Sequence, residues 1–301
     1  MLSNSALADP FRATNPREVG DQTEQAFKAM FEQGNYVEAT ELLQTAEASE
    51  PLAHALKASL AYMDEDWDTM SENAQLTLET AEKLLETDPL RGNLYIAAGL
   101  FLEGAHTVST QGIVQSTPTV LRKLQQVFNH LNEAERIDPA DPELNLLKGY
   151  MDLMLAVNLP FSDPEQAIER LENYAAPSYL AQRGIAIGYR DLEQPDKALA
   201  AVDQALQETP NNPELFYLKA QILRLLSDDA EGDAQKRLQG ESLGLFRQAW
   251  TLRAQMPEST VDQMEREACR TFQQSRDRDP NACGDRQINW QRTQQASEPS
   301  S

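Results

Sequence analysis

Residues 179–210 read YLAQRGIAIGYRDLEQPDKALAAVDQALQETP, and this stretch decides the fold. Both of its halves carry apolar or small residues at intervals of three and four, the spacing of one face of an α-helix. These positions are Leu180, Gly184, Ile187 and Gly188 in the first half and Ala198, Val202, Ala205 and Leu206 in the second. Glu193-Gln194-Pro195-Asp196 separates the halves, and its proline interrupts a helix. The stretch therefore predicts a helical hairpin.

The hairpin recurs along the chain. Strand-like alternation is almost absent, whereas similar proline-containing phrases return at steps that fit a period in the mid-thirties with insertions. The phrases are Thr87-Asp88-Pro89, Ile137-Asp138-Pro139 and Glu208-Thr209-Pro210, and Pro51, Pro177 and Pro257 mark further hairpin ends. A repeat of this length predicts stacked helical hairpins rather than separate domains.

At these residues the chain resembles the tetratricopeptide repeat (TPR) family. Segment 179–210 matches best, with Ala186 and Tyr189 on its first helix and Ala198, Ala205 and Pro210 on its second. The other matching segments are 22–51 (Gly34-Asn35-Tyr36, Ala39, Leu43, Ala46, Pro51), 142–177 (Gly149, Ala167, Leu171, Pro177) and 213–257 (Ala220, Phe246, Ala249, Pro257). Segments 52–89 and 90–139 are more divergent, and we expect inserts near Val108–Pro118 and 227–240.

The predicted fold is all-α, a right-handed superhelical solenoid of stacked TPR-like hairpins. One hairpin cannot bury its apolar face alone, so neighbours share a continuous core and the last one needs a cap. We expect an irregular segment over 1–18, the repeats over 19–257, a capping helix over 258–275 and a polar flexible tail over 276–301. Trp290 in this tail is either an exposed anchor for a partner or part of a disordered end, and the disordered end is favoured.

The charge is strongly acidic. The chain has 26 Lys and Arg against 48 Asp and Glu, a net −22, and residues 1–90 hold 18 acids and 5 bases. Proteins bind nucleic acids and anionic membranes through clustered lysine and arginine side chains. Because this chain is strongly acidic, we expect no nucleic-acid partner. The most apolar stretch, Leu94 to Ala105, is too short to span a bilayer, so we expect no membrane insertion.

No arrangement of residues points to catalysis. His54, His106 and His130 do not form a metal-binding spacing, and the sequence has neither a glycine-rich phosphate loop nor a GxSxG motif. The run Asp64-Glu65-Asp66 lacks the spacing of a calcium loop and indicates a solvated turn. We therefore expect no enzyme activity, no metal and no cofactor.

The resemblance implies that the first helix of each hairpin lines a concave binding face. Residues at i, i+4 and i+7 share a helix face, which groups Arg183, Ile187 and Arg190 in one hairpin and Tyr217, Gln221 and Arg224 in the next, with Tyr150 one hairpin earlier. Arginine and tyrosine dominate binding energies, so this patch is the candidate partner-binding site. The alternative is that Arg183 and Arg190 pair with neighbouring acids such as Asp191 and Glu193.

The predicted function is that of a protein-interaction scaffold, an assembly factor or adaptor that binds a partner segment on the concave face. The alternative is a structural subunit that associates with itself or with an envelope complex. Some TPR proteins grip acidic chaperone tails through a clamp of lysine and asparagine. Here Glu24 and Lys28 occupy the clamp positions, so we expect no chaperone-tail partner.

Two features bear on the compartment. Cys269 and Cys283 are either free thiols or a disulfide that closes a short loop. Ala6-Leu7-Ala8 is similar to the end of an export signal, although the charged and apolar parts that precede such an end are missing. An exported, periplasmic bacterial protein is favoured slightly over a cytoplasmic one.

Overall fold

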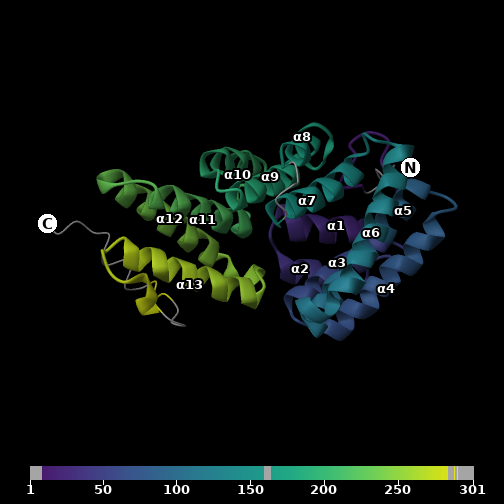
Figure 1. Ribbon diagram of the computed structural model, residues 1–301, viewed down its shortest axis with the longest axis horizontal. Helices are drawn as coiled ribbons and strands as arrows, with labels where there is room; N and C mark the ends of the chain where they lie inside the picture. The colour runs from purple at the N-terminus through teal and green to yellow at the C-terminus, as the bar shows by residue number, and fades with distance from the viewer. Residues whose placement is uncertain (1–8, 159–163, 284–287, 289, 291–301) are drawn as a thin grey trace, which may run out of the picture. The chain divides into compact units, whose positions relative to one another are not determined.

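The computed structural model describes residues 9–158, 164–283, 288 and 290, and the regular secondary structure in those ranges is helical, with no strand (Figure 1). The chain divides into two compact units, Met1–Gly184 and Ile185–Ser301, and the boundary falls inside one helix, α9. The prediction of an all-α fold of stacked hairpins is confirmed. None of the described helices is long and apolar enough to cross a membrane.

The N-terminal unit is a run of helical hairpins in which each helix packs against its neighbours in the chain, as α1 does on α2 and α3 on α4 (Figure 1). Its helices are α1 (Asp21–Phe27, continued by a π-helical turn over Lys28–Glu32), α2 (Tyr36–Leu43), α3 (Pro51–Met63), α4 (Trp67–Leu84), α5 (Pro89–Gln111), α6 (Ile113–Ile137), α7 (Pro142–Asn158), α8 (Pro164–Tyr174) and α9 (Ser178–Asp191). The odd-numbered helices are therefore the first helices of their hairpins.

Several prolines begin helices rather than end them. Pro51 and Pro89 open α3 and α5, because proline has no N–H to lose at the first helical turn and its fixed φ suits that position. The preceding acids cap these helices: the Leu52 N–H donates to the Glu50 carboxylate (2.9 Å) and the Arg91 N–H to Asp88 (3.1 Å).

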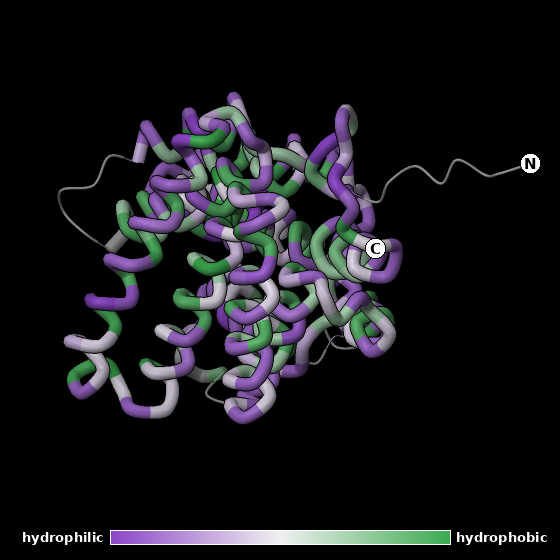
Figure 2. Tube along the Cα trace, turned by 90° about the vertical axis from the view of Figure 1, so that its right-hand side faces the viewer, coloured by the Kyte–Doolittle hydropathy of each residue, from purple (hydrophilic) through white to green (hydrophobic). Residues whose placement is uncertain are grey.

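Small residues bring the helices of a hairpin close together. Ala39 and Ala167 are buried at the positions that the TPR resemblance singles out. At Gly149 on α7, a Cβ atom would lie 2.6 Å from the side chain of Leu171 on α8, so only glycine fits there. Apolar and polar positions alternate around the turns of each helix (Figure 2), as expected of helices with one buried face.

The insert expected near Val108–Pro118 is helical. α5 continues to Gln111 and α6 starts at Ile113, so Gly112 alone joins them. Its φ of 77° lies in the left-handed region, which glycine adopts without strain. Together α5 and α6 form a hairpin of 23 and 25 residues.

The C-terminal unit contains the end of α9 and then α10 (Pro195–Glu208), α11 (Pro213–Asp228), α12 (Gly232–Thr251) and α13 (Glu258–Gln274), with 3₁₀ turns at Arg253–Gln255 and Pro280–Cys283. Most of the polar insert expected over 227–240 is the beginning of α12. The expected capping helix is α13, and it packs on α12.

The end of the chain differs from the expected flexible tail where it is described. The sulfurs of Cys269 on α13 and Cys283 lie at disulfide distance, 2.04 Å. Trp290 is 8% exposed, and its ring lies 5.9 Å from that of Trp250 in the core of the C-terminal unit. The expectation that Trp290 is disordered was wrong, because its large apolar ring gains more from burial than a polar tail does. The Ala6-Leu7-Ala8 stretch lies outside the described residues.

Candidate functional site

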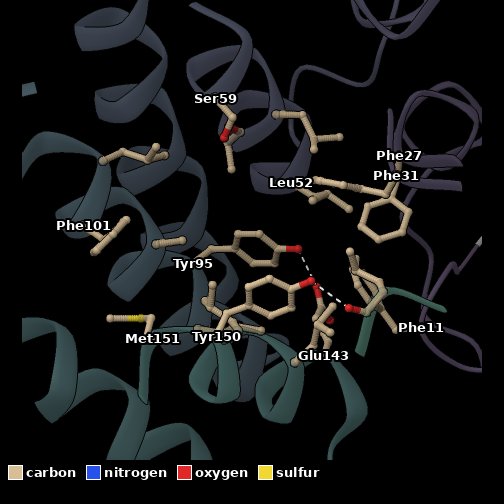
Figure 3. Close-up of a pocket in the computed structure, with 18 of the residues that line it drawn as sticks. Phe11, Phe27, Phe31, Leu52, Ser59, Tyr95, Phe101, Glu143, Tyr150 and Met151 are labelled. Atoms are coloured by element: carbon tan, nitrogen blue, oxygen red, sulfur yellow. Dashed lines mark hydrogen bonds between the residues drawn. The ribbon is translucent and has the colours of Figure 1, made fainter. Parts of the chain in front are cut away.

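The N-terminal unit contains a cavity of about 380 Å³ on the face formed by the first helices of its hairpins. We call it the aromatic groove. Its walls come from α1, α3, α5, α7 and α9, the π-helical turn and the N-terminal segment, and α2, α4, α6 and α8 contribute no lining residue. In Figure 3, Phe11, Phe27 and Phe31 lie at one end, Phe101 and Met151 lie at the other, and the rings of Tyr95 and Tyr150 lie between them.

The lining follows directly from helix periodicity. On α5, Leu94, Ala98 and Phe101 stand at i, i+4 and i+7 and line the groove together. The same spacing selects Leu52, Leu56 and Ser59 on α3, and Glu143, Leu147 and Tyr150 on α7. Because each helix turns the same stripe inward, the stripes of successive hairpins merge into one apolar surface.

A buried carboxylate, Glu143, lies at the floor of the groove. The Tyr95 hydroxyl donates a hydrogen bond to it, and burial, reinforced by the Glu143 charge, raises the pKa of Tyr95. Arg12 Nη2 lies 3.1 Å from the Glu143 carboxylate and Arg91 Nε lies 3.3 Å from it. The negative charge of Glu143 is thus balanced by two arginines of the same fold. The hydroxyl of Tyr95 keeps its proton and donates it in the hydrogen bond.

Arg91 joins this carboxylate to a second one. Its Nη2 lies 2.7 Å from Glu50 Oε1, and its guanidinium carbon lies 5.1 Å from the centre of the Tyr95 ring. Burial raises the pKa of Glu50, although Arg91 opposes the shift. Both side chains are almost fully enclosed, so removing either would leave an uncompensated charge in the protein interior.

The irregular N-terminal segment is anchored to the same network. Arg12 Nη2 lies 2.5 Å from Asp141 Oδ2, and Arg12 Nη1 lies 3.1 Å from Asp9 Oδ2. Arg17 adds ion pairs to Asp141 (3.1 Å) and Asp88 (3.2 Å). These contacts fix Phe11, whose ring packs edge-on against Phe27, in the wall of the groove. The chain's own N-terminal segment therefore occupies one end of the groove and leaves the remainder open.

The predicted partner-binding residues divide between the two units. Tyr150 and Arg183 both line the aromatic groove, and the Tyr150 hydroxyl donates to the Leu180 carbonyl (2.7 Å). A Cβ atom at Gly184 would lie 2.7 Å from the Tyr150 ring, so the glycine allows the ring to approach α9 closely. The sequence argument thus selected two lining residues and omitted the aromatic side chains around them.

Ile187, Arg190, Tyr217, Gln221 and Arg224 belong to the C-terminal unit, where α13 engages part of this set. The Tyr217 hydroxyl (3.0 Å) and Gln221 Nε2 (2.9 Å) both donate to the carboxylate of Glu267 on α13. Burial, together with the Glu267 charge, raises the pKa of Tyr217.

Arg190 is also engaged within the chain. Its Nη1 donates to Gln221 (2.8 Å) and its Nη2 pairs with Asp191 (2.7 Å). The alternative considered for Arg190, pairing with a neighbouring acid, is therefore present in the structure.

The histidines and acids do not gather into a metal-binding cluster within the described part of the chain. No group of three or more His, Cys, Asp or Glu there could hold a metal ion. His54 Nε2 lies 2.9 Å from the Ala48 carbonyl, and His130 Nδ1 lies 2.8 Å from the Asn93 side chain. At the positions of the chaperone clamp, Lys28 pairs with Glu24 (2.9 Å).

Solved structures share this fold, whereas no protein-family model and no curated protein sequence matches the chain. A human IFIT1 dimer with m7Gppp-AAAA is 20% identical, with a TM-score of 0.50, over 83% of this chain and 54% of that one. A monomeric IFIT1 mutant with m7Gppp-AAAA is 18% identical, with a TM-score of 0.50, over 83% of this chain and 55% of that one. This chain spans about half the length of those proteins.

The expectation of no nucleic-acid partner, drawn from the net charge, was wrong as an exclusion. The similar structures hold capped RNA, so an acidic total charge does not rule out nucleic acid for a chain with this fold. The physical reason is that a few cations gathered at one site create a local field that the total charge does not describe. At these identities the likeness establishes the fold alone, which is a TPR-like helical-repeat fold.

Proposed function

We propose that this chain is a binding scaffold whose N-terminal unit holds an apolar segment of a partner protein in the aromatic groove. The observation that carries the proposal is the chemistry of the lining. The carboxylate at the floor is bonded to Tyr95, Arg12 and Arg91, so the groove offers aromatic and aliphatic walls to a ligand. Such walls favour a helix that presents side chains at i, i+3, i+4 and i+7.

The surrounding charge indicates what flanks the apolar segment. Residues 1–90, which supply α1 to α4, hold 18 acids and 5 bases. A field of this sign attracts basic residues and repels acidic ones, which affects the association rate and the choice of partner more than the final affinity. The proposed occupant is therefore an amphipathic helix whose apolar stripe is bordered by Lys or Arg.

Arg183 on α9 is a charged residue in the lining of the groove. A guanidinium binds a carboxylate through two parallel hydrogen bonds, so Arg183 would contact a carboxylate at the end of the bound segment, beside the Tyr150 ring. We also propose a second contact region, formed by Ile187, Arg190, Tyr217, Gln221 and Arg224. A partner that binds there would compete with Glu267 for the hydrogen bonds of Tyr217 and Gln221.

Capped RNA is the second candidate ligand. Similar solved structures hold it, and the faces of Tyr95 and Tyr150 could stack on bases. The two candidates make opposite demands, because a peptide uses the apolar walls whereas an RNA end requires cations for its phosphates.

The test is fluorescence anisotropy on the full chain with three probes: an amphipathic helix of leucine and lysine, the same pattern built from leucine and glutamate, and m7Gppp-AAAA. We expect the leucine–lysine peptide to bind most tightly. Ala98→Phe, which fills the groove from α5, should weaken that binding at least tenfold.

Ala140→Phe is the matched control, since it adds the same ring at an exposed turn of the same unit, and it should bind like the wild type. Equal affinity of Ala98→Phe and wild type would remove the groove from the proposal. Binding of the RNA without binding of the peptide would replace the peptide by the RNA.

Export to an oxidising compartment is also proposed. The pairing of Cys269 with Cys283 supports it, since structural disulfides persist outside the reducing cytosol. Alkylation of protein taken directly from its native source measures this: no modified cysteine is expected, and two alkylated thiols would contradict export.

A further inference from the structure

The α5–α6 hairpin ends in an exposed apolar tip. Ile113 is 75% exposed and Val114 87%, directly after the Gly112 turn, and Leu121 is 61% exposed further along α6. Val114, Pro118 and Leu121 stand at i, i+4 and i+7, so they form one stripe on the outer face of the helix. Contiguous exposed apolar residues on a folded unit mark a contact surface.

A second cavity adjoins this tip on the same hairpin. It has a volume of about 280 Å³, lies between the C-terminal half of α5 and the N-terminal half of α6, and has an almost wholly apolar lining. Its rim includes Tyr62 and Met154, themselves 48% and 41% exposed, and its walls include Val108, Val120 and Leu124. An exposed apolar tip and an apolar hollow thus lie on the same hairpin.

The charge of this face is unlike that of the rest of the chain. Residues 104–132 contain no Asp or Glu, although the chain has 48 of them, and they include Arg122 and Lys123. Lys123 pairs with Glu103 on α5, and Arg122 is exposed. Two copies with a net charge of −22 repel each other at close approach, and residues 104–132 add no acid to that repulsion.

We infer that a second copy of this chain docks on the α5–α6 face and forms a two-fold dimer. A two-fold interface uses the same patch on both partners, so the patch must be complementary to itself. The tip and the hollow meet that condition: Ile113 and Val114 of each copy enter the hollow beside Leu124 of the other. A flat or wholly convex apolar patch would lack this complementarity.

The size of the face fits a dimer. α6 has 25 residues, about 37 Å of helix at 1.5 Å per residue, and a helix with its side chains is about 10 Å wide. Two adjacent helices over most of that length present a footprint on the order of 600 Å². Stable interfaces bury about 800 Å² of accessible area per partner, which a non-planar surface of this footprint approaches.

The test is the molar mass of the full chain by size-exclusion chromatography with light scattering over a wide range of concentrations. We expect a mass that rises from one chain to two as concentration increases. Ile113→Asp with Val114→Asp should raise the dimer dissociation constant at least tenfold, and Met154→Asp at the rim of the hollow should also raise it.

Val37→Asp is the control, because Val37 is a half-exposed valine on α2, away from the hairpin, and it should dimerise like the wild type. Circular dichroism checks that each variant keeps its helices. A wild type that stays monomeric at every concentration, or a dimer that survives the tip substitutions, overturns the proposal. A monomer that binds phosphatidylcholine vesicles through Ile113 also overturns it and assigns the tip to a lipid surface.

Discussion

In the N-terminal unit, the first helices of the hairpins line a cavity that is open to solvent. In the C-terminal unit, α13 covers the corresponding face of α11. Tyr217 and Gln221 on α11 stand at the helix positions that Leu146 and Tyr150 occupy on α7. The first pair donates hydrogen bonds to Glu267 of the chain's own last helix, while the second pair lines the aromatic groove.

This difference shows that the inner face of a repeat unit can either be covered by another helix of the same chain or line a cavity. In the C-terminal unit, α13 with Cys283, Ile288 and Trp290 covers the apolar surface of α11 and α12. The N-terminal unit pairs its buried acids with Arg12 and Arg17 of its N-terminal segment and with Arg91 of α5, and it leaves a cavity beside its aromatic side chains. The same helix stripe therefore stabilises one unit and offers a binding surface in the other.

The largest effect is expected from removing the central cation of the N-terminal network. Arg91→Ala leaves Glu50 and Glu143 buried without this partner, and breaking one side of a buried pair costs about 3–5 kcal/mol. Urea unfolding of the full chain measures the loss. Arg136→Ala removes an arginine from an exposed pair with Glu133 and should cost under about 1 kcal/mol; similar losses for both variants would show that the network does not hold the groove.

The next largest effect concerns the cap of the C-terminal unit. The pair Cys269–Cys283 closes a loop with a sequence separation of 14, for which the chain-entropy account gives about 3 kcal/mol. Replacing both residues (Cys269→Ser with Cys283→Ser) should lower the unfolding free energy by this amount and speed hydrogen exchange in α13. Unchanged exchange in α13 would mean that the disulfide does not secure the cap.

A smaller effect is expected at Glu267, where α13 meets α11. Glu267→Ala leaves two donors, Tyr217 and Gln221, without their acceptor, a cost of about 1–3 kcal/mol. Hydrogen exchange should rise in α13 while the α3–α7 helices keep their protection. Glu258→Ala, an exposed acid at the start of the same helix, is the control, and an equal effect at Glu258 would remove the special role of Glu267.

The smallest effect is a pH dependence confined to the N-terminal unit. Glu47 caps α1 by accepting hydrogen bonds from the Gln22 and Thr23 N–H groups and the Thr23 hydroxyl. Burial alone would raise the pKa of Glu47, but these bonds outweigh it and lower the pKa. A lowered folded pKa means stability that is present above the unfolded value and is lost as pH falls through the folded value.

Glu47→Gln should therefore cost about 1 kcal/mol at neutral pH, a typical value for a lost cap, and the two proteins should become equally stable in acid. Thermal unfolding at a series of pH values measures this. A difference between the two proteins that does not change with pH would contradict the capping role.

The sequence was sufficient to predict the helical hairpins and the helix α13. Segment 179–210 has the helical stripe, the proline break and the small residues, and these depend on neighbouring positions alone. The capping helix expected over 258–275 corresponds to α13, in which Met264 and Ala268 are buried on one face.

The groove was missed for a different reason. Arg183 and Tyr150 were selected by residue type, yet the i, i+4, i+7 rule that grouped Arg183 with Arg190 also groups Leu94, Ala98 and Phe101. Applied to every first helix, it would have found the groove. Phe11 and Trp290 could not be found this way, because their burial depends on contacts with helices far away in the sequence.

The central claim is that the groove of the N-terminal unit is open to a partner segment while the matching face of the C-terminal unit is closed by α13. A leucine–lysine peptide carrying a photoreactive benzoyl group, cross-linked to the full chain and mapped by mass spectrometry, tests this directly. We predict cross-links to α3, α5 and α7 that disappear in Ala98→Phe. Cross-links concentrated on α11 and α13, or unchanged in Ala98→Phe, would contradict the account.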